Sequence, residues 1–139
     1  MQKIILDTNV IISALIQKSY PHLILYHYFL ENKVKTCLSE ELLQEYYDVI
    51  NRPKFSKYPH FLTKAELLLI ELEKKSDWFH PIHKVDLLID KDDNKILELA
   101  ETSQASFIIT GNTNHFTFDQ HKTTRIVSPK DYWDIYAPR

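Results

Sequence analysis

Residues 107–116, FIITGNTNHF, contain the sharpest change of pattern in the chain. The apolar residues 107–109 stop at a polar turn around Gly111, which is the single glycine of the sequence. A short apolar run that ends in such a turn is typical of a buried strand in a parallel sheet. Polar groups that directly follow such strands often serve a site. We therefore expect the amides Asn112 and Asn114 to lie at a functional site.

Strand-like and helix-like segments alternate through the rest of the chain. Apolar runs with abrupt polar ends predict strands, and apolar residues at helical spacing predict helices. The predicted strands are residues 3–6, 34–38, 105–110 and 124–128. The predicted helices are residues 9–16, 21–32, 40–50, 64–75, 94–103 and 130–136. This alternation predicts an α/β fold with a mainly parallel central sheet.

Polar residues mark where several of these helices begin. Ser39 is expected to cap the helix that follows it. Thr63 and Glu66 have the spacing of a capping box for the next helix along the chain. Asp92 or Asp93 is expected to open the helix that follows the acidic run.

Length and composition indicate one globular domain. The chain has 139 residues, of which 44% are hydrophobic, and this is enough for a single core over residues 1–139. The formal net charge of −2 excludes a globally basic surface. The lone cysteine, Cys37, excludes a disulfide framework and a multi-cysteine zinc site, and it favours a reducing, cytoplasmic setting.

Hydropathy gives no sign of a membrane segment. A membrane-spanning helix needs about 18 or more consecutive apolar residues, and no run of that length occurs. The N-terminal stretch has almost no positive charge before its apolar run, which Asp7 and Asn9 interrupt, so it does not look like a signal peptide. We therefore expect no membrane partner.

Carboxylates occur at three points of the chain where a site could form. Asp7 follows the first predicted strand, Glu45 flanks the apolar face of a helix, and Asp90, Asp92 and Asp93 precede a later helix. Each also has an ordinary role open to it: a helix cap, a solvated flank or a complement to the helix dipole. Together they predict a site for a hard cation such as Mg²⁺ or Mn²⁺. Such an ion can activate water and stabilise charge on a phosphodiester.

Four segments, in this order, resemble the PIN-domain family and, more narrowly, its VapC-like toxin group. They are ILDTNVIISAL (5–15), SEELLQEYYDVI (39–50), DKDDNKILELAETSQASFIITGN (90–112) and IVSPKDYWDIY (126–136). The resemblance covers nearly the whole chain. It implies a three-layer α/β/α sandwich around a central, mainly parallel sheet, which agrees with the alternation of strands and helices.

The acidic positions of the family can be carried over residue by residue. The resemblance assigns the three catalytic, metal-binding acids to Asp7, Glu45 and Asp93. Where the family usually reads TGD, this chain reads TGN, so Asn112 takes the place of the fourth acid as a metal ligand. The supporting positions are Asn9, Thr110, Asp90 and Asn114.

The resemblance implies metal-dependent cleavage of RNA with Mg²⁺ or Mn²⁺. Many members of the family are toxins that a small antitoxin protein neutralises, so the implied partners are an RNA substrate and an antitoxin. An amide oxygen can bind Mg²⁺ but cannot neutralise its charge or accept a proton. We therefore expect Asn112 to weaken an endoribonuclease by about 10–100-fold.

Two other functions stay open. The first is a catalytically inert PIN-like domain that binds RNA or a protein partner. Asn112 favours this reading, whereas the three retained acids oppose it, because clustered carboxylates repel one another without a cation. The second is a small-molecule phosphatase with Asp7 as nucleophile. It is disfavoured because Asn9 stands where such enzymes generally have a second aspartate.

Two segments are candidate contact surfaces. Residues 51–61 interleave basic and aromatic side chains, which suits single-stranded RNA but also an ordinary basic loop. The basic residues are Arg52, Lys54 and Lys57, and the aromatic residues are Phe55, Tyr58 and Phe61. Residues 20–33 are rich in apolar side chains, which predicts a homodimer surface, an antitoxin groove or a buried helix. Lys95 is a candidate for contact with phosphate or a solvated side chain.

Overall fold

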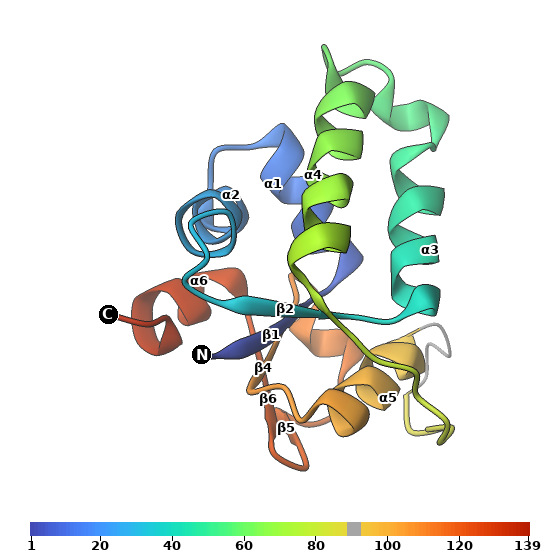
Figure 1. The fold of residues 1–139 in the computed structure, drawn as a ribbon, viewed down its shortest axis with the longest axis vertical. Helices are drawn as coiled ribbons and strands as arrows, with labels where there is room; N and C mark the ends of the chain where they lie inside the picture. Colours follow the sequence, from blue (N-terminus) through green and yellow to red (C-terminus); the bar gives the residue numbers. More distant parts are fainter. Residues whose placement is uncertain (89–92) are drawn as a thin grey trace.

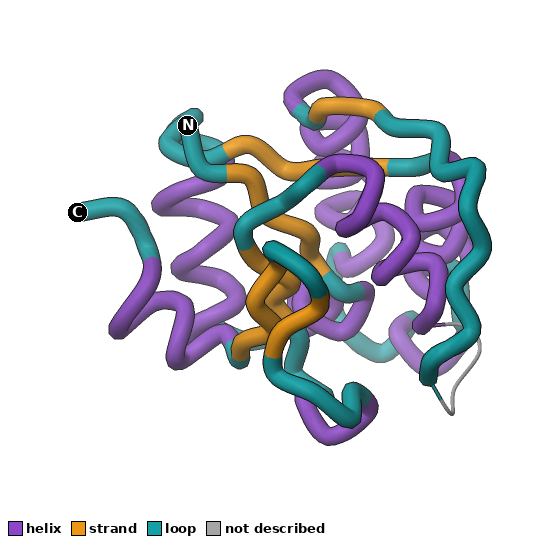
Figure 2. Tube along the Cα trace, turned by 90° about the horizontal axis from the view of Figure 1, so that it is seen from below, coloured by secondary structure: helices purple, strands orange, loops and turns teal. Residues whose placement is uncertain are grey.

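The computed structural model of the protein describes residues 1–88 and 93–139. Within these residues, six strands form one sheet in the order β3-β2-β1-β4-β6-β5, which Figure 1 and Figure 2 show at the centre of the molecule. The strands are β1 (Lys3–Leu6), β2 (Lys35–Leu38), β3 (Asp77–Trp78), β4 (Phe107–Ile109), β5 (Gln120–His121) and β6 (Thr124–Val127). The neighbouring strands are parallel except for the β5–β6 hairpin. The predicted mainly parallel sheet is confirmed.

Helices cover both faces of this sheet. In Figure 1, α1, α3 and α4 lie on one side of the strands and α5 lies on the other. The α-helices are α1 (Thr8–Ile16), α2 (Tyr20–Leu23), α3 (Glu40–Ile50), α4 (Phe61–Lys75), α5 (Asn94–Ser103) and α6 (Pro129–Asp131). Two 3₁₀ turns, η2 (Pro53–Phe55) and η4 (Thr113–His115), and two π-helical segments, η1 (Ile24–Phe29) and η5 (Tyr132–Tyr136), complete the described elements. The result is the three-layer α/β/α arrangement that the sequence predicts.

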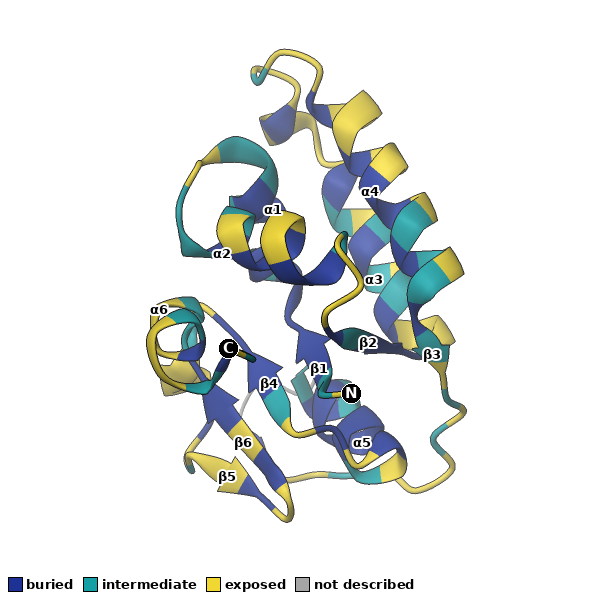
Figure 3. Ribbon diagram, turned by 60° about the vertical axis from the view of Figure 1, so that its left-hand side comes forward, coloured by how far each residue is buried: buried dark blue, intermediate teal, exposed yellow. Residues whose placement is uncertain are grey.

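The core lies between the central strands and the helices packed on them. Ile4 and Ile5 point to opposite faces of β1 and are both fully buried, because β1 lies between β2 and β4 and is covered on both sides. In Figure 3, the strands β1 and β4 are mostly buried, whereas the outer face of α4 is exposed. Within the described residues, no helix combines the length and apolar character needed to cross a membrane.

Several elements begin or end where the sequence predicts. The strand at 3–6 and the helix at 94–103 are reproduced, and the Ser39 hydroxyl caps α3 by accepting a hydrogen bond from the Leu42 N–H at 3.2 Å. Strands β3 and β5 are not predicted. Each is two residues long, which is too short to show an alternating pattern.

The predicted capping box at Thr63 and Glu66 is wrong. Helix α4 begins at Phe61, three residues before the predicted start at residue 64, so Thr63 lies inside its first turn. Phe61 is buried and stacks on Phe55 at a ring-centre distance of 5.0 Å. Burial of this ring fixes the start of the helix, and the preceding His60 enters it from a left-handed backbone conformation.

The helix predicted for residues 21–32 is shorter than expected. It consists of α2 followed by the wider π-helical segment η1, which ends at Phe29. Ile24, Leu25, Tyr28 and Phe29 are buried, so much of its apolar surface belongs to the core. Tyr26 remains 40% exposed.

Candidate active site

The first site residues follow two adjacent parallel strands. Leu6 of β1 is paired with Ile109 of β4, so the residues after both strands lie at the same edge of the sheet. The Asp7 N–H donates to the Ile109 carbonyl at 3.0 Å. The Thr110 hydroxyl donates to Asp7 Oδ2 at 2.7 Å. Asp7 and Thr110 are therefore in direct contact, although 103 positions separate them in the sequence.

The Asp7 carboxylate is buried and accepts further hydrogen bonds. Its side chain caps α1 by accepting from the Thr8 N–H at 2.7 Å, and Oδ2 also accepts from Asn9 Nδ2 at 3.2 Å. The expected capping role is thus confirmed, and the same side chain lines the cavity described below. A carboxylate has about four acceptor positions, and the bonds from Thr8, Asn9 and Thr110 use three of them.

Burial raises the pKa of Asp7 above its usual value. The hydrogen bonds from Thr110 and Thr8 oppose this effect by stabilising the carboxylate, and the nearby Glu45 charge adds to it. The buried Asp7 carboxylate is therefore held at an electrostatic cost that a bound cation would reduce.

The turn after β4 is fastened to the start of α1. The Gly111 N–H donates to Asn9 Oδ1 at 2.9 Å, and the Asn112 N–H donates to the Thr110 hydroxyl at 3.0 Å. A Cβ atom on Gly111 would lie 3.1 Å from Asn9 Oδ1. Gly111 does not have a positive φ, so the glycine serves this close approach and not a left-handed turn.

Glu45 reaches the site from α3. Its Oε2 accepts a hydrogen bond from the Thr8 hydroxyl, and its Oε1 lies 2.7 Å from Lys95 Nζ of α5. The side chains of Lys95 and Glu45 are 18% and 25% exposed. Lys95 therefore does not behave as a solvated lysine but links α5 to the acidic site.

Asp93 stands at the start of α5, on the other side of the site. Its side chain does not cap the helix. Instead, Asp93 Oδ2 lies 3.4 Å from Nδ1 of His115, which belongs to the turn after β4. The predicted start of the helix is correct, and the Asp93 carboxylate is turned toward the site.

One cavity of about 500 Å³ brings these groups together. Its acidic lining residues are Asp7, Glu45 and Asp93, which come from three different elements. The other lining residues are Thr8, Asn9, Ile12, Ser13, Val49, Arg52, Lys54, Phe55, Asn112 and His115. The grouping of the acids that the resemblance implies is thus present in space.

Two of the three predicted basic residues reach this cavity. Arg52 and Lys54 line it, whereas Lys57 does not line it and lies over the Tyr58 ring, with Nζ 5.4 Å from the ring centre. The suggested stacking of bases on Phe55 and Phe61 is not favoured by the structure. Both rings are buried and stack on each other, because they join η2 to α4 in the core.

One supporting residue of the sequence prediction lies away from the cavity, and another is not among the described residues. Asn114 is exposed and does not line the cavity, although it lies only two residues from Asn112. Asp90 and its neighbour Asp92 fall outside the described residues.

The donor set suits a largely hydrated cation. Within residues 1–88 and 93–139, no three Asp, Glu, His or Cys side chains lie close enough together to enclose a metal ion alone. Mg²⁺ usually keeps several waters and is bound through only one or two carboxylates. Asp7 with its remaining acceptor position, together with Asp93 and the Asn112 amide, fits that demand.

The sequence prediction missed His115 and the contact of Lys95. His115 comes three residues after Asn112 in the same turn, a position that could have marked it as a site residue. The Lys95 contact had no such signal, because Lys95 and Glu45 are brought together only by the packing of α5 against α3.

A mainly parallel sheet with helices on both faces and three acids lining one cavity places the chain among α/β/α proteins with an acidic site. The family model described as "PIN domain" matches residues 3–114. The chain is also similar to an uncharacterized protein of Methanocaldococcus jannaschii, with 32% identity over 126 residues that cover 89% of this chain and 80% of that protein. The chain belongs to the PIN-domain family, whose members are generally nucleases that use divalent metal ions.

Proposed function

We propose that this chain is an Mg²⁺- or Mn²⁺-dependent endoribonuclease. The observation that supports the proposal is the convergence of Asp7, Glu45 and Asp93 on one cavity at the carboxyl edge of the sheet. Three carboxylates in one cavity repel one another, and this cost is offset when a cation binds. The family to which the chain belongs commonly uses such ions.

The residues of the cavity would have different roles in hydrolysis. Asp7, Asp93 and Asn112 would hold the cation. When bound, the cation would polarise the phosphodiester and make a bound water more acidic. Thr110 and Asn9 hold the Asp7 carboxylate in place. The carboxylates are the groups available to take the proton of the attacking water.

The basic residues at the cavity are suited to an RNA backbone. Arg52 and Lys54 line the same cavity as the acids and are exposed, so they can reach phosphates on either side of the cleaved bond. This arrangement supports the proposed RNA substrate through contacts to the backbone, which carry no sequence preference by themselves.

Cleavage of a mixed RNA pool tests the proposal. We expect the purified chain to produce fragments with Mn²⁺ or Mg²⁺, and Glu45→Gln to reduce the rate by about 10–100-fold. Asp48→Asn is a matched control, because Asp48 is an exposed acid on the same helix. Equal cleavage by the native chain and by Glu45→Gln would contradict the proposal.

An inert PIN-like domain that binds RNA or a protein is the second candidate. The observation that favours it is Asn112, which lines the cavity where the family usually has an acid. Asn112→Asp separates the two candidates. If three acids suffice, the native chain cleaves RNA and the variant cleaves it about 10–100-fold faster. Cleavage by Asn112→Asp together with a silent native chain would support the inert candidate.

We further propose that the chain is a VapC-like toxin that acts in the cytoplasm and pairs with an antitoxin. Apolar side chains are exposed on η1 and α4, with Tyr26 at 40%, Leu67 at 60% and Ile70 at 42%. A hollow of about 240 Å³ between Tyr26 and Leu67 adds to this surface. It supports contact with an antitoxin or with a second copy in a homodimer.

Growth and size measurements test these partner proposals. Expression of the native chain should arrest bacterial growth, and expression of Asp7→Asn should not. Light scattering should report a dimer for the native chain and a monomer for Leu67→Glu. Normal growth with active native enzyme would contradict the toxin role, and a native monomer would contradict the homodimer.

A further inference from the structure

An ammonium group is built into the acidic site. Lys95 projects from the first turn of α5, and Nζ lies 2.7 Å from Glu45 Oε1. The other oxygen of Glu45 accepts a hydrogen bond from the Thr8 hydroxyl. Both oxygens of this carboxylate are therefore engaged by donors of the protein.

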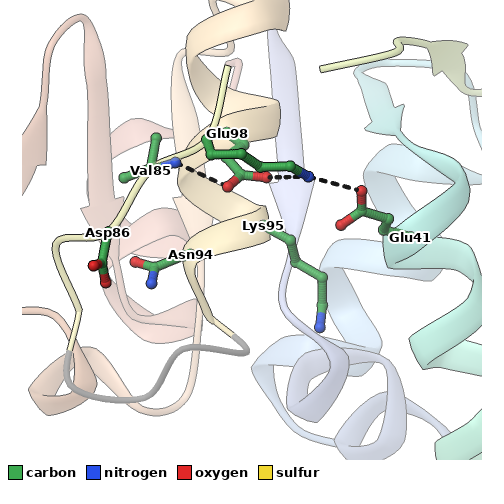
Figure 4. Close-up of a pocket in the computed structure, with 7 residues that line it drawn as sticks. Glu41, Val85, Asp86, Asn94, Lys95 and Glu98 are labelled. Atoms are coloured by element: carbon green, nitrogen blue, oxygen red, sulfur yellow. Dashed lines mark hydrogen bonds and ion pairs between the residues drawn. The ribbon is translucent and has the colours of Figure 1, made fainter. Parts of the chain in front are cut away.

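The position of Lys95 is distinct from that of a nearby surface lysine. Lys84 also links α3 to α5, with Nζ 3.6 Å from Glu41 Oε1 and 3.8 Å from Glu98 Oε1, but its side chain is 73% exposed. Figure 4 shows the Lys95 side chain pointing away from Glu41 and Glu98. Lys95 is instead 18% exposed and directed at a carboxylate that lines the cavity of Asp7.

Charge limits how many cations such a site can hold. The described acids of the cavity, Asp7, Glu45 and Asp93, carry three negative charges, and the Lys95 ammonium offsets one of them. Among the described side chains, the charge of Glu45 is therefore already offset, which disfavours a second cation at that carboxylate. Arg52 and Lys54 also line the cavity, but they are exposed, so solvent screens their charges more strongly.

We propose that the Lys95 ammonium takes the place of a second metal ion, so that the chain binds one divalent cation at Asp7 and Asp93. A compact ammonium paired with Glu45 neutralises the charge that a second ion would otherwise neutralise, and it repels another cation at that carboxylate. The proposal rests on the proposed metal-dependent nuclease and adds the number of ions that it uses.

Metal stoichiometry tests the proposal without a measurement of activity. Mn²⁺ is titrated into EDTA-stripped protein, and free Mn²⁺ is followed by electron paramagnetic resonance. We expect one Mn²⁺ per chain for the native protein, one for Lys95→Arg, which keeps the charge, and two for Lys95→Met. Lys84→Met is the matched control, because it removes a lysine that links the same two helices, and it should bind one.

The outcomes distinguish this proposal from the function on which it rests. Two Mn²⁺ per native chain, or one per Lys95→Met chain, would overturn the role of Lys95 while leaving a metal-dependent nuclease intact. No Mn²⁺ on the native chain and no RNA cleavage would overturn both. Circular dichroism of each variant in EDTA establishes that the fold is kept. If Lys95→Met does not fold, Lys95→Arg serves as the second test. Two Mn²⁺ ions on Lys95→Arg would overturn the proposal.

Discussion

Asp7 shows how one side chain serves both the fold and the site. It caps α1 through the Thr8 N–H, receives the Thr110 hydroxyl, and is buried at the sheet edge. Capping of α1 alone does not require a buried carboxylate. Its burial raises the pKa, and the hydrogen bond from Thr110 limits that rise. The geometry of Thr110 is therefore expected to control when Asp7 is ionised.

Thr110→Val tests this control. Loss of the hydroxyl removes a bond that favours the carboxylate, so the pKa of Asp7 rises further and Asp7 stays protonated to a higher pH. We expect Mn²⁺ affinity at neutral pH to fall about 10–100-fold. The pH below which protonation of Asp7 weakens Mn²⁺ binding should also be higher than in the native chain. Titration calorimetry at several pH values measures both effects.

Thr124→Val is the control for this substitution. Thr124 is another buried threonine, and its hydroxyl donates to the Ala105 carbonyl at 2.6 Å, away from the cavity. It should lower stability without changing Mn²⁺ affinity. If both variants weakened Mn²⁺ binding equally, the effect would come from general destabilisation.

At the scale of elements, α3 and α5 connect the sheet to the site. Tyr46 of α3 is buried, and its hydroxyl donates to the carbonyl of Leu6, the residue before Asp7. On the opposite face, α5 holds the β5–β6 hairpin through Glu101, which binds His121 and Lys122, each at 2.7 Å. Each helix thus fixes a neighbouring strand end or turn by a polar contact.

Tyr46→Phe is expected to destabilise the chain by about 1–3 kcal/mol, because it leaves the buried Leu6 carbonyl without its partner. Urea unfolding measures the change. Tyr47→Phe is the matched control, since the Tyr47 hydroxyl donates to Glu73 Oε2 at 2.8 Å in a partly buried contact. A cost for Tyr46→Phe no greater than for Tyr47→Phe would show that the link to β1 contributes little.

Glu101→Gln should destabilise the chain in a pH-dependent way. Hydrogen bonds from Lys122 and His121 lower the pKa of Glu101 below its ordinary value of 4.5. Its contribution is therefore fully present above the unfolded pKa and is lost as pH falls through the folded pKa. We expect a difference from the native chain of up to about 1 kcal/mol at pH 7, shrinking below pH 4.5. A difference that is constant with pH would contradict the ion-pair explanation.

At the scale of the whole molecule, the layers could be read from the sequence because they depend on local patterns. The strand at 3–6 and the helix at 94–103 each have a clear apolar period and a polar boundary. The pairing of Lys95 with Glu45 could not be read, because it depends on how α5 packs across from α3. The burial of Phe55 was missed because an aromatic residue in a basic segment has no sequence pattern that separates core from surface.

Metal binding should stabilise the chain as one unit. We predict a single cooperative unfolding transition, as expected for one domain over residues 1–139. Mn²⁺ at 100 times its dissociation constant should add about 2.7 kcal/mol and raise Tm by roughly 5–10 °C. Scanning calorimetry of the native chain and Asp7→Asn, with and without Mn²⁺, measures this. Two transitions would contradict the single domain, and an equal Mn²⁺ shift in Asp7→Asn would place the metal elsewhere.

Metal add-back is the most direct test of a nuclease that works through Asp7 and a divalent cation. EDTA-stripped native chain and Asp7→Asn are incubated with a labelled RNA pool, and Mn²⁺ is then added to both. We expect intact RNA before the addition, fragments afterwards with the native chain, and none with Asp7→Asn. Fragments in EDTA, or equal fragments from both proteins, would contradict a nuclease that works through Asp7 and a divalent cation.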